Sequence, residues 1–260
     1  MIPAGELNRI RARFAALTSR VRVDFFTLLK QGELAIAGRE CTHCDDIQAM
    51  LEDLDAVSTR IALTVHDIET AADTATKLGV DKIPAIVIRG QTNRALRYFG
   101  SPSQRQFAVF IEALIMASTG VTGLEDETVR LLRKLRSDVT VRILVTPDCK
   151  FSPAMAFNAL RFGLQSSRVK VDVIDVTQFP ALLRQIGVPA VPLTVVNDTY
   201  ATPGVLSESD TAQAILQAAE GEEVSVKSRP NSVTRLVRPQ PRRQQPPGPR
   251  RSPGGLILPH

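Results

Sequence analysis

Cysteine is scarce in this chain, and its scarcity limits the possible roles of the thiols. Three cysteines in 260 residues are too few for a disulfide framework. Two of them, Cys41 and Cys44, form one Cys-x-x-Cys motif. In a reducing compartment, a close pair of this kind is more typical of redox chemistry or metal binding than of a structural disulfide.

Long apolar runs are absent as well. No stretch approaches the roughly 18 uninterrupted apolar residues that a membrane span requires. The charged segment 7–13 follows the first residues too closely for a signal peptide. We therefore expect no membrane span and a cytoplasmic location. The hydrophobic content of 43% is sufficient for one large core or two smaller ones.

Acidic residues are absent after Glu223, whereas eight prolines follow Lys227. Residues 225–260 are therefore predicted to be a disordered basic Pro-rich tail. The tail carries eight of the basic residues, so the sequence pI of about 9.4 does not indicate a nucleic-acid groove in the folded part. Solubilisation is its simplest role; binding of an acidic partner, nucleic acid or anionic lipid is the alternative.

An internal repeat divides the rest of the chain. Four markers recur at one offset of 108 residues, namely Cys41 and Cys149, Asp67 and Asp175, Gly79 and Gly187, and Pro84 and Pro192. Four independent coincidences at one offset indicate two copies of a unit of ordinary domain size. We place the two units at residues 1–118 and 119–224.

Each copy has a pattern typical of a β-α-β-α-β-β-α unit, which predicts an α/β fold. In the first copy the predicted elements are strand 20–29, helix 45–54, strand 60–65, helix 69–78, strands 85–89 and 95–99, and helix 104–116. In the second they are strand 140–145, helix 153–162, strand 169–176, helix 179–185, strand 192–196 with its turn at 197–198, and helix 209–219. A leading helix is expected before Val21, and its counterpart at 126–135. Segment 30–40 has no counterpart, and its structure stays open.

The first motif lies where a loop enters a helix. Cys41 is then near the helix N-terminus, where backbone N–H groups and the helix dipole favour the thiolate. Cys44, one turn later, can attack a mixed disulfide formed by Cys41. His43 adds a polar, partly cationic donor, which is expected to lower the pKa of Cys41 toward about 7 or below. Asp45 and Asp46 oppose that effect.

Two other interpretations of the thiol pair remain. A zinc site requires four ligands, and a second Cys-x-x-Cys is absent. His66 and His260 are the remaining histidines, and they lie in a predicted strand and in the tail. We therefore expect no metal and no cofactor. The second alternative is an inert thiol pair on a helix.

Pro84 and Pro192 each lie 43 residues after the first cysteine position of their unit, at the start of an apolar strand. A cis bond before Pro84 would turn the backbone so that Ile83 can pair with a substrate chain. A trans proline at the first residue of a strand is the alternative, and the residues alone do not decide between them.

Together these motifs resemble the thioredoxin and glutaredoxin pattern. The tandem arrangement resembles the protein disulfide oxidoreductase family. The closer match rests on Leu96-Arg-Tyr-Phe-Gly-Ser-Pro102, Val145-Thr-Pro-Asp-Cys149 and Ala190-Val-Pro192, and the resemblance covers about residues 5–220.

The resemblance implies two tandem thioredoxin-fold units packed together, with cis bonds before Pro84 and Pro192. It also implies dithiol–disulfide exchange on protein disulfides, a role in cell redox homeostasis, and reduction by a flavin-dependent, thioredoxin-reductase-like electron donor. Cys41, Cys44, His43 and Pro84 are then the expected catalytic residues, and Cys41 and Cys44 the redox-active disulfide.

The second unit departs from the family pattern. Ser152 stands where the resolving cysteine is expected, so Cys149, Ser152 and Pro192 form a secondary degenerate site that cannot cycle as a dithiol. Cys149 is either a vestige or a monothiol nucleophile that acts on glutathione mixed disulfides. No tryptophan precedes Cys41, which separates the chain from ordinary thioredoxins.

Two function classes follow. The first is an enzyme, a protein-disulfide oxidoreductase of the thioredoxin/glutaredoxin type. The second is a degenerate interaction module that docks partners through its groove and tail. The intact Cys41–Cys44 motif with His43 favours the enzyme.

Overall fold

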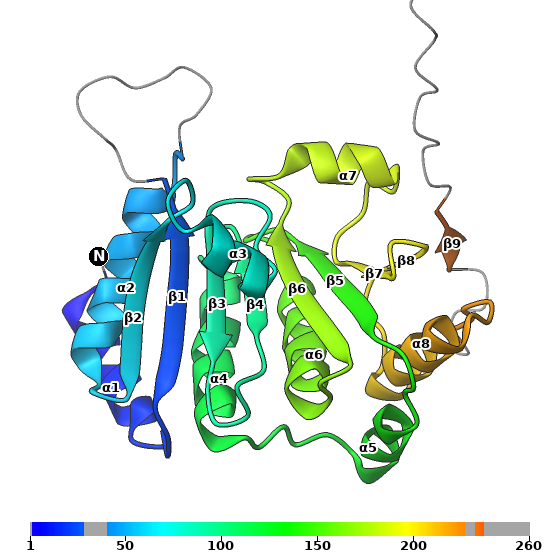
Figure 1. Cartoon of the computed structure of the whole chain (residues 1–260), viewed down its shortest axis with the longest axis horizontal. Coiled ribbons are helices and arrows are strands. Elements are labelled where there is room, and N and C mark those ends of the chain that lie inside the picture. Colours follow the sequence, from blue (N-terminus) through cyan, green and yellow to red (C-terminus); the bar gives the residue numbers. More distant parts are fainter. Residues whose placement is uncertain (1, 29–40, 227–231, 237–260) are drawn as a thin grey trace, which may run out of the picture.

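The computed structural model describes residues 2–28, 41–226 and 232–236. In this part of the chain, nine strands form one sheet in the order β2-β1-β3-β4-β6-β5-β7-β8-β9. Helices cover both faces of the sheet (Figure 1). The predicted α/β class is therefore confirmed, with two units of the same plan side by side in one mixed sheet.

The first unit has its elements in the predicted order. β1 and β2 run parallel, and β3 pairs antiparallel with both β1 and β4. The bounds are α1 (Ala4–Phe14), β1 (Val21–Thr27), α2 (Cys44–Val57), β2 (Ile61–Asp67), α3 (Ala72–Leu78), β3 (Ala85–Arg89), β4 (Leu96–Phe99) and α4 (Arg105–Thr119).

The second unit repeats this pairing. β5 and β6 run parallel, and β7 pairs antiparallel with both β5 and β8. The bounds are α5 (Asp126–Arg133), β5 (Val139–Val145), α6 (Ser152–Gln165), β6 (Val169–Asp175), α7 (Pro180–Ile186), β7 (Leu193–Val196), β8 (Tyr200–Pro203) and α8 (Glu208–Glu220). The bounds of the predicted elements differ from these by three residues or fewer. The predicted boundary at 118/119 falls in the last turn of α4, and segment 30–40 lies outside the described residues.

The segment that starts at residue 225 differs from its predicted disorder where the structure describes it. Val226 is buried, and Thr234–Arg235 form β9, which pairs antiparallel with β8. The N–H of Leu236 donates to the carbonyl oxygen of Thr199 at 2.6 Å. Apolar side chains explain the difference, because Val226 and Val233 reach the core of the second unit. These few residues therefore belong to the folded part of the chain; 227–231 and 237–260 lie outside the described ranges.

Parallel pairing of β4 with β6 joins the two units into one sheet. In its register Arg97 lies opposite Asp172, and Nε of Arg97 is 2.5 Å from Oδ1 of Asp172. Their side chains are 11% and 8% exposed. Nε of Arg142, on β5, lies 3.6 Å from the other carboxylate oxygen of Asp172. The joint therefore contains a nearly buried carboxylate between two arginines.

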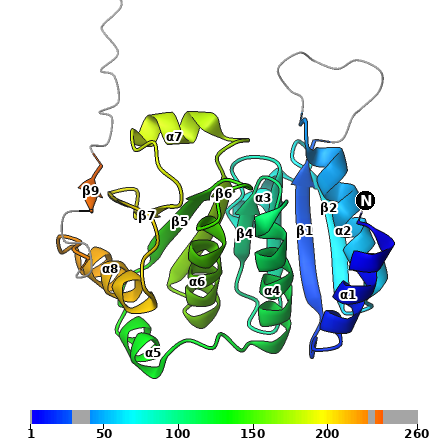
Figure 2. The same ribbon diagram turned by 180° about the vertical axis from the view of Figure 1, so that it is seen from behind.

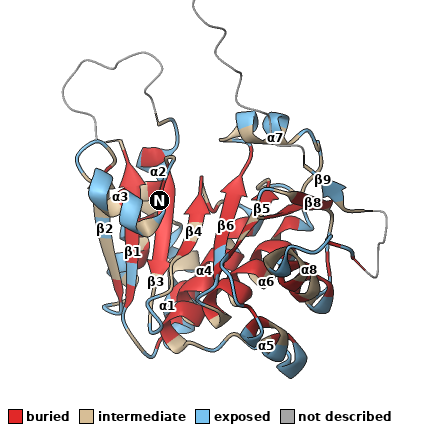
Figure 3. Ribbon diagram, turned by 45° about the vertical axis from the view of Figure 1, so that its right-hand side comes forward, coloured by how far each residue is buried: buried red, intermediate tan, exposed pale blue. Residues whose placement is uncertain are grey.

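Strand residues alternate between two apolar layers. Val21, Val23 and Phe25 of β1 point into a core that continues through both units beneath α2, α4 and α6. Figure 2 shows α4 and α6 side by side on this face. Phe26 and its neighbours on the opposite face pack with α3 and α7. Figure 3 shows that the strands are largely buried while α7 is exposed on its outer side. The two units are thus packed together, as predicted.

The repeated aspartates shape corresponding loops in the two units. Asp67, at the end of β2, accepts a hydrogen bond from the N–H of Glu69 at 2.9 Å. Asp175, at the end of β6, accepts one from the N–H of Thr177 at 3.0 Å. Short Asx-type bonds of this kind turn the chain two residues after the aspartate. They fix the β2–α3 and β6–α7 loops at the same edge of the sheet.

We expect Asp172→Ala to lower the free energy of unfolding by about 3–5 kcal/mol, because it leaves Arg97 buried without its ionic partner. Urea denaturation followed by circular dichroism measures this, since the chain has no tryptophan. Asp138→Ala is the matched control. Asp138 is 55% exposed and pairs with Lys170 at the surface, so its loss is expected to cost less than about 1 kcal/mol. Equal losses for the two variants would contradict the importance of the buried pair.

Candidate redox site

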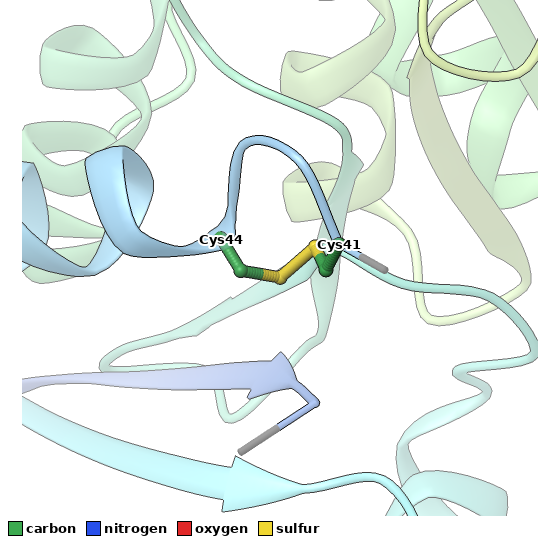
Figure 4. Close-up of a disulfide and its surroundings, with 2 residues drawn as sticks. All are labelled: Cys41 and Cys44. Carbon is green, nitrogen blue, oxygen red and sulfur yellow. A yellow bond between two sulfur atoms is a disulfide. The ribbon is translucent and has the colours of Figure 1, made fainter. Parts of the chain in front are cut away.

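The two cysteines of the first unit are bonded to each other at the start of α2. Figure 4 shows Cys41 in the loop and Cys44 at the first turn of the helix, with a disulfide between them. The N–H of Cys44 donates to the carbonyl oxygen of Cys41 at 3.3 Å. Ile47, Leu51 and Leu54 are buried on one face of α2 and hold the helix on the sheet. The amphipathic helix thereby positions the dithiol at the sheet edge.

The two sulfur-bearing residues differ in access. Cys44 is 2% exposed, whereas Cys41 is partly exposed. His43 is exposed and occupies the N-cap position of α2, where its side chain makes no capping hydrogen bond to the described residues. Asp45 and Asp46 follow in the first helical turn. This asymmetry is what an attacking thiol at position 41 and a protected resolving thiol at position 44 require.

A groove of about 600 Å³ passes over the dithiol. Cys41, Thr42 and His43 contribute to it from the loop before α2, and Pro84 from the residue before β3. The described residues that line it are Leu28, Cys41, Thr42, His43, Ile68, Glu69, Ile83, Pro84, Thr177, Gln178 and Pro180. The structure thus brings Cys41, His43 and Pro84 together at one groove, with Cys44 beneath Cys41.

The prolines have the predicted backbone form. The Ile83–Pro84 and Val191–Pro192 peptide bonds are both cis, which confirms the expectation drawn from the resemblance. The carbonyl oxygen of Pro84 accepts from the N–H of Gly100 at 2.9 Å, and that of Pro192 accepts from the N–H of Gly204 at 2.8 Å. The two units therefore share this local geometry even though their thiol chemistry differs.

The second unit keeps the cysteine position but not the dithiol. Ser152 is the first residue of α6 and is fully buried, as Cys44 is the first residue of α2. Cys149 precedes the helix, and its thiol lies 3.8 Å from the carbonyl oxygen of Val191, to which it donates. The buried hydroxyl of Ser152 has no partner at normal hydrogen-bond geometry in the described part of the chain, which leaves it available to the Cys149 sulfur.

The surroundings of Cys149 favour its thiolate. Burial raises the pKa of Cys149, but the Ser152 hydroxyl and the backbone N–H groups of Phe151 and Ser152 favour the thiolate and together outweigh that effect. Asp148 opposes them through its charge. The resulting pKa of Cys149 is lower than the ordinary value for a thiol.

The two thiol sites lie at the same edge of the sheet but apart. β1 and β5 run in the same direction, so the loops that follow them, with Cys41 and Cys149, emerge on one side. Three strands separate β1 from β5 in the sheet. At about 4.8 Å per strand spacing, the strand ends are about 19 Å apart. A disulfide requires its two Cα atoms to lie within about 7 Å of each other, so the two sites are too far apart to bond to each other.

A buried ionic cluster within the sheet of the first unit was missed at the sequence level. Asp24 of β1 is 6% exposed; its Oδ1 lies 2.9 Å from Nε2 of His66, and its Oδ2 accepts from Arg89 at 2.6 Å. The His66 ring stacks on Phe26 with 4.7 Å between centroids. His66 is therefore a packed strand residue, as expected. An aspartate inside an apolar strand was the available signal for the cluster.

Within the described residues, the structure contains neither a candidate metal-binding group nor a candidate membrane-spanning helix. There, no group of three or more His, Cys, Asp or Glu residues is placed to hold a metal ion. None of the helices in the same ranges has the length and apolar content that a membrane crossing needs.

Thr177, Gln178 and Pro180 were also missed as site residues. They line the groove of the first dithiol but belong to the second unit, more than a hundred residues along the chain from Cys41. No local pattern in the sequence marks them, because their position depends on how the two units join.

Comparison with known proteins agrees with this architecture. A thioredoxin domain family model matches residues 139–217, which lie in the second unit. None of the curated proteins is similar in sequence at a significant level.

Two solved structures cover most of the chain. A protein disulfide oxidoreductase from Aeropyrum pernix K1 superimposes with a TM-score of 0.75 at 21% identity, over 85% of this chain and 94% of that one. The NTD N/C domain of the alkyl hydroperoxide reductase AhpF from Enterococcus faecalis gives a TM-score of 0.72 at 18% identity, over 83% of this chain and all (100%) of that one. At these identities the likeness concerns the fold. The chain therefore has the tandem thioredoxin fold that is also found in protein disulfide oxidoreductases.

Proposed function

We propose that the chain is a thiol–disulfide oxidoreductase that acts on protein disulfides through Cys41 and Cys44. The observation that carries this proposal is the disulfide between these residues at the N-terminus of α2, with Cys41 at an open groove and Cys44 buried behind it. His43 and Pro84 line the same groove. This geometry suits a reversible exchange in which one sulfur meets the substrate and the other releases it.

The exchange proceeds in two balanced steps. The Cys41 thiolate attacks one sulfur of the substrate disulfide; a mixed disulfide forms, and the other substrate sulfur leaves as a thiolate. The Cys44 thiolate then attacks the Cys41 sulfur, which forms the Cys41–Cys44 disulfide and releases the second substrate thiolate. Two electrons pass from the protein to the substrate, and the reverse sequence oxidises a substrate dithiol.

A further cycle of reduction requires an external dithiol donor. By analogy with the family resemblance, we propose a flavin-dependent, thioredoxin-reductase-like protein as that donor and no cofactor bound to this chain. We further propose that the basic tail binds an acidic partner, since it carries eight basic residues and no acidic one.

We expect the protein to accelerate the reduction of insulin by dithiothreitol, and we expect Cys41→Ser to abolish the acceleration. Without the Cys41 sulfur no mixed disulfide can form at this site. The measurement is the turbidity of the insulin B chain against time. Cys149→Ser is the matched control and is expected to retain the activity. Full activity in Cys41→Ser would show that the assignment is wrong.

We expect the Cys41–Cys44 couple to have a reduction potential of about −180 to −230 mV, between the values of the disulfide isomerase and the glutaredoxins. His43→Ala is expected to make the potential more negative by on the order of 30 mV, because it removes a donor that stabilises the Cys41 thiolate in the reduced form. Equilibration with glutathione buffers, read by mass spectrometry, measures both values. Thr42→Ala, at the neighbouring exposed position, serves as the control. An unchanged or less negative potential in His43→Ala counts against the role of His43.

Cys149 supports a second candidate function, deglutathionylation by a single thiol. Its lowered pKa and partial exposure favour attack on a glutathione mixed disulfide. Ser152 cannot resolve the product, so an external thiol must release it. This activity is independent of the first site because the two sites lie far apart at the sheet edge.

In a Cys41→Ser/Cys44→Ser variant, oxidised glutathione is expected to add one glutathione to Cys149, as measured by mass spectrometry. The rate is expected to rise with pH and to level off once the pH exceeds the lowered pKa of Cys149, since the thiolate is the nucleophile. Ser152→Ala removes a hydroxyl group that favours the thiolate, so the pKa of Cys149 is expected to rise and the rate at pH 7 to fall several-fold. An unmodified Cys149 after long incubation, or a Ser152→Ala variant that reacts faster, would exclude this candidate.

A further inference from the structure

We propose that the second unit forms one wall of the substrate groove of the first unit's dithiol, and that its β6–α7 loop selects which polypeptide segments reach Cys41. Thr177 and Gln178 of this loop and Pro180, the first residue of α7, line the groove together with Cys41. This inference rests on the proposed exchange at Cys41 and Cys44, and it assigns to the degenerate unit a role that does not involve Cys149.

The parallel pairing of β4 with β6 places the β6–α7 loop beside the dithiol. β4 and β6 run parallel with Phe99 opposite Ile174, so the residues that follow both strands emerge together at the active-site edge. At Gly100, which follows β4, the first unit lies very close to Asp175 and Gln178 of the second unit. This glycine has a positive φ of 95°, and a Cβ built on it would lie 2.8 Å from Cβ of Asp175 and 3.4 Å from Cδ of Gln178. Because the N–H of Gly100 donates to Pro84, the loop lies one strand away from the proline of the first site.

Hydrogen bonds and packing hold the loop in a fixed form. The carboxylate of Asp175 accepts from the N–H and the hydroxyl of Thr177 and from the amide of Gln178. Phe179 packs into the same apolar cluster as Ile83, which precedes Pro84. A bound segment therefore meets a rigid wall, which limits the conformational entropy lost on binding.

The opposite wall comes from the corresponding loop of the first unit. Ile68 and Glu69 line the groove, and Asp67 fixes their loop as Asp175 fixes the loop of the second unit. The repeat thus supplies both walls from equivalent positions, one loop from each unit. A groove bounded in this way accommodates a polypeptide segment on both sides of the attacked sulfur.

The occupant we assign is an extended segment of a disulfide-bonded polypeptide. The groove volume of about 600 Å³ is in the range of about 300–1,000 Å³ typical of ligand sites. A small disulfide can contact Cys41 without reaching the second unit, whereas a polypeptide carries residues on either side of its cysteine. The wall should therefore affect polypeptide substrates and not small ones.

The charge of the walls provides a sharp test. The three lining residues of the second unit, Thr177, Gln178 and Pro180, are uncharged. In the parent protein they therefore favour neither acidic nor basic substrate segments. Pro180 is exposed and is the first residue of α7, where another side chain can replace it without disturbing a buried contact. Pro180→Glu and Pro180→Lys place opposite charges on the wall. Gln185→Glu and Gln185→Lys are matched controls, because Gln185 is exposed on the same helix and does not line the groove.

The experiment uses the full chain with Cys149→Ser in every variant. Reduced protein is mixed with three peptide disulfides that differ only in two residues beside the cysteine, which are both Lys, both Glu or both Ser. Hydroxyethyl disulfide is the small substrate. Acid quenching and mass spectrometry give the second-order rate constant for formation of the Cys41–Cys44 disulfide.

Pro180→Glu is expected to raise the rate constant for the Lys peptide and lower that for the Glu peptide by about twofold to fivefold each, the range for one exposed ion pair. Pro180→Lys is expected to reverse both changes. The Ser peptide and hydroxyethyl disulfide are expected to react as with the parent protein, and added salt to reduce the differences.

The outcomes separate the two proposals. Suppose that the Pro180 variants discriminate among the peptides no more than the Gln185 variants do, while hydroxyethyl disulfide still reacts. The proposed role of the second unit in selecting polypeptides is then wrong, whereas the proposed dithiol function is not affected. If no disulfide oxidises Cys41 and Cys44 in the parent protein, both proposals are wrong. An equal change in the rate constant for hydroxyethyl disulfide would also contradict the proposed role of the wall, because it would show an effect on the dithiol itself.

Discussion

Parallel pairing of β4 with β6 is the interaction on which the arrangement of the whole molecule depends. It converts two small sheets into one, and it lets the apolar core under α4 and α6 run through both units. It also encloses Arg97 and Asp172, whose charges are tolerated there because each satisfies the other. This register also determines how the loops at the thiol-bearing edge of one unit lie relative to those of the other unit.

The two units show how one backbone plan can carry different chemistry. Cys44 and Ser152 occupy the same place at the first turn of equivalent helices, and both are buried. A sulfur at this place allows the first site to form a disulfide, whereas an oxygen in the second leaves Cys149 without a resolving partner. The hydroxyl and the helix N–H groups still favour the Cys149 thiolate, so loss of turnover does not require loss of reactivity.

The second unit, whose own site lacks a dithiol, contributes part of the groove over the first dithiol. Its β6–α7 loop is shaped by Asp175, in the same manner as Asp67 shapes the β2–α3 loop. In a single unit, one side of the attacking cysteine would face solvent. In the tandem form both sides face protein, and this is the physical basis of the proposed selection among polypeptide substrates.

Local patterns in the sequence determined the elements, the repeat and the main site. The spacing of Cys41 and Cys44, the position of Pro84 and the αL-prone Gly79 are set within short stretches of chain, and neighbouring residues alone determine a helix start or a turn. Tertiary structure decided the pairing of β4 with β6, the contact of Gln178 with the first site and the addition of β9 to the sheet edge. These contacts join residues that are far apart in sequence. Hydrophobic periodicity shows which face of a strand is buried, but it does not specify the strand that lies beside it.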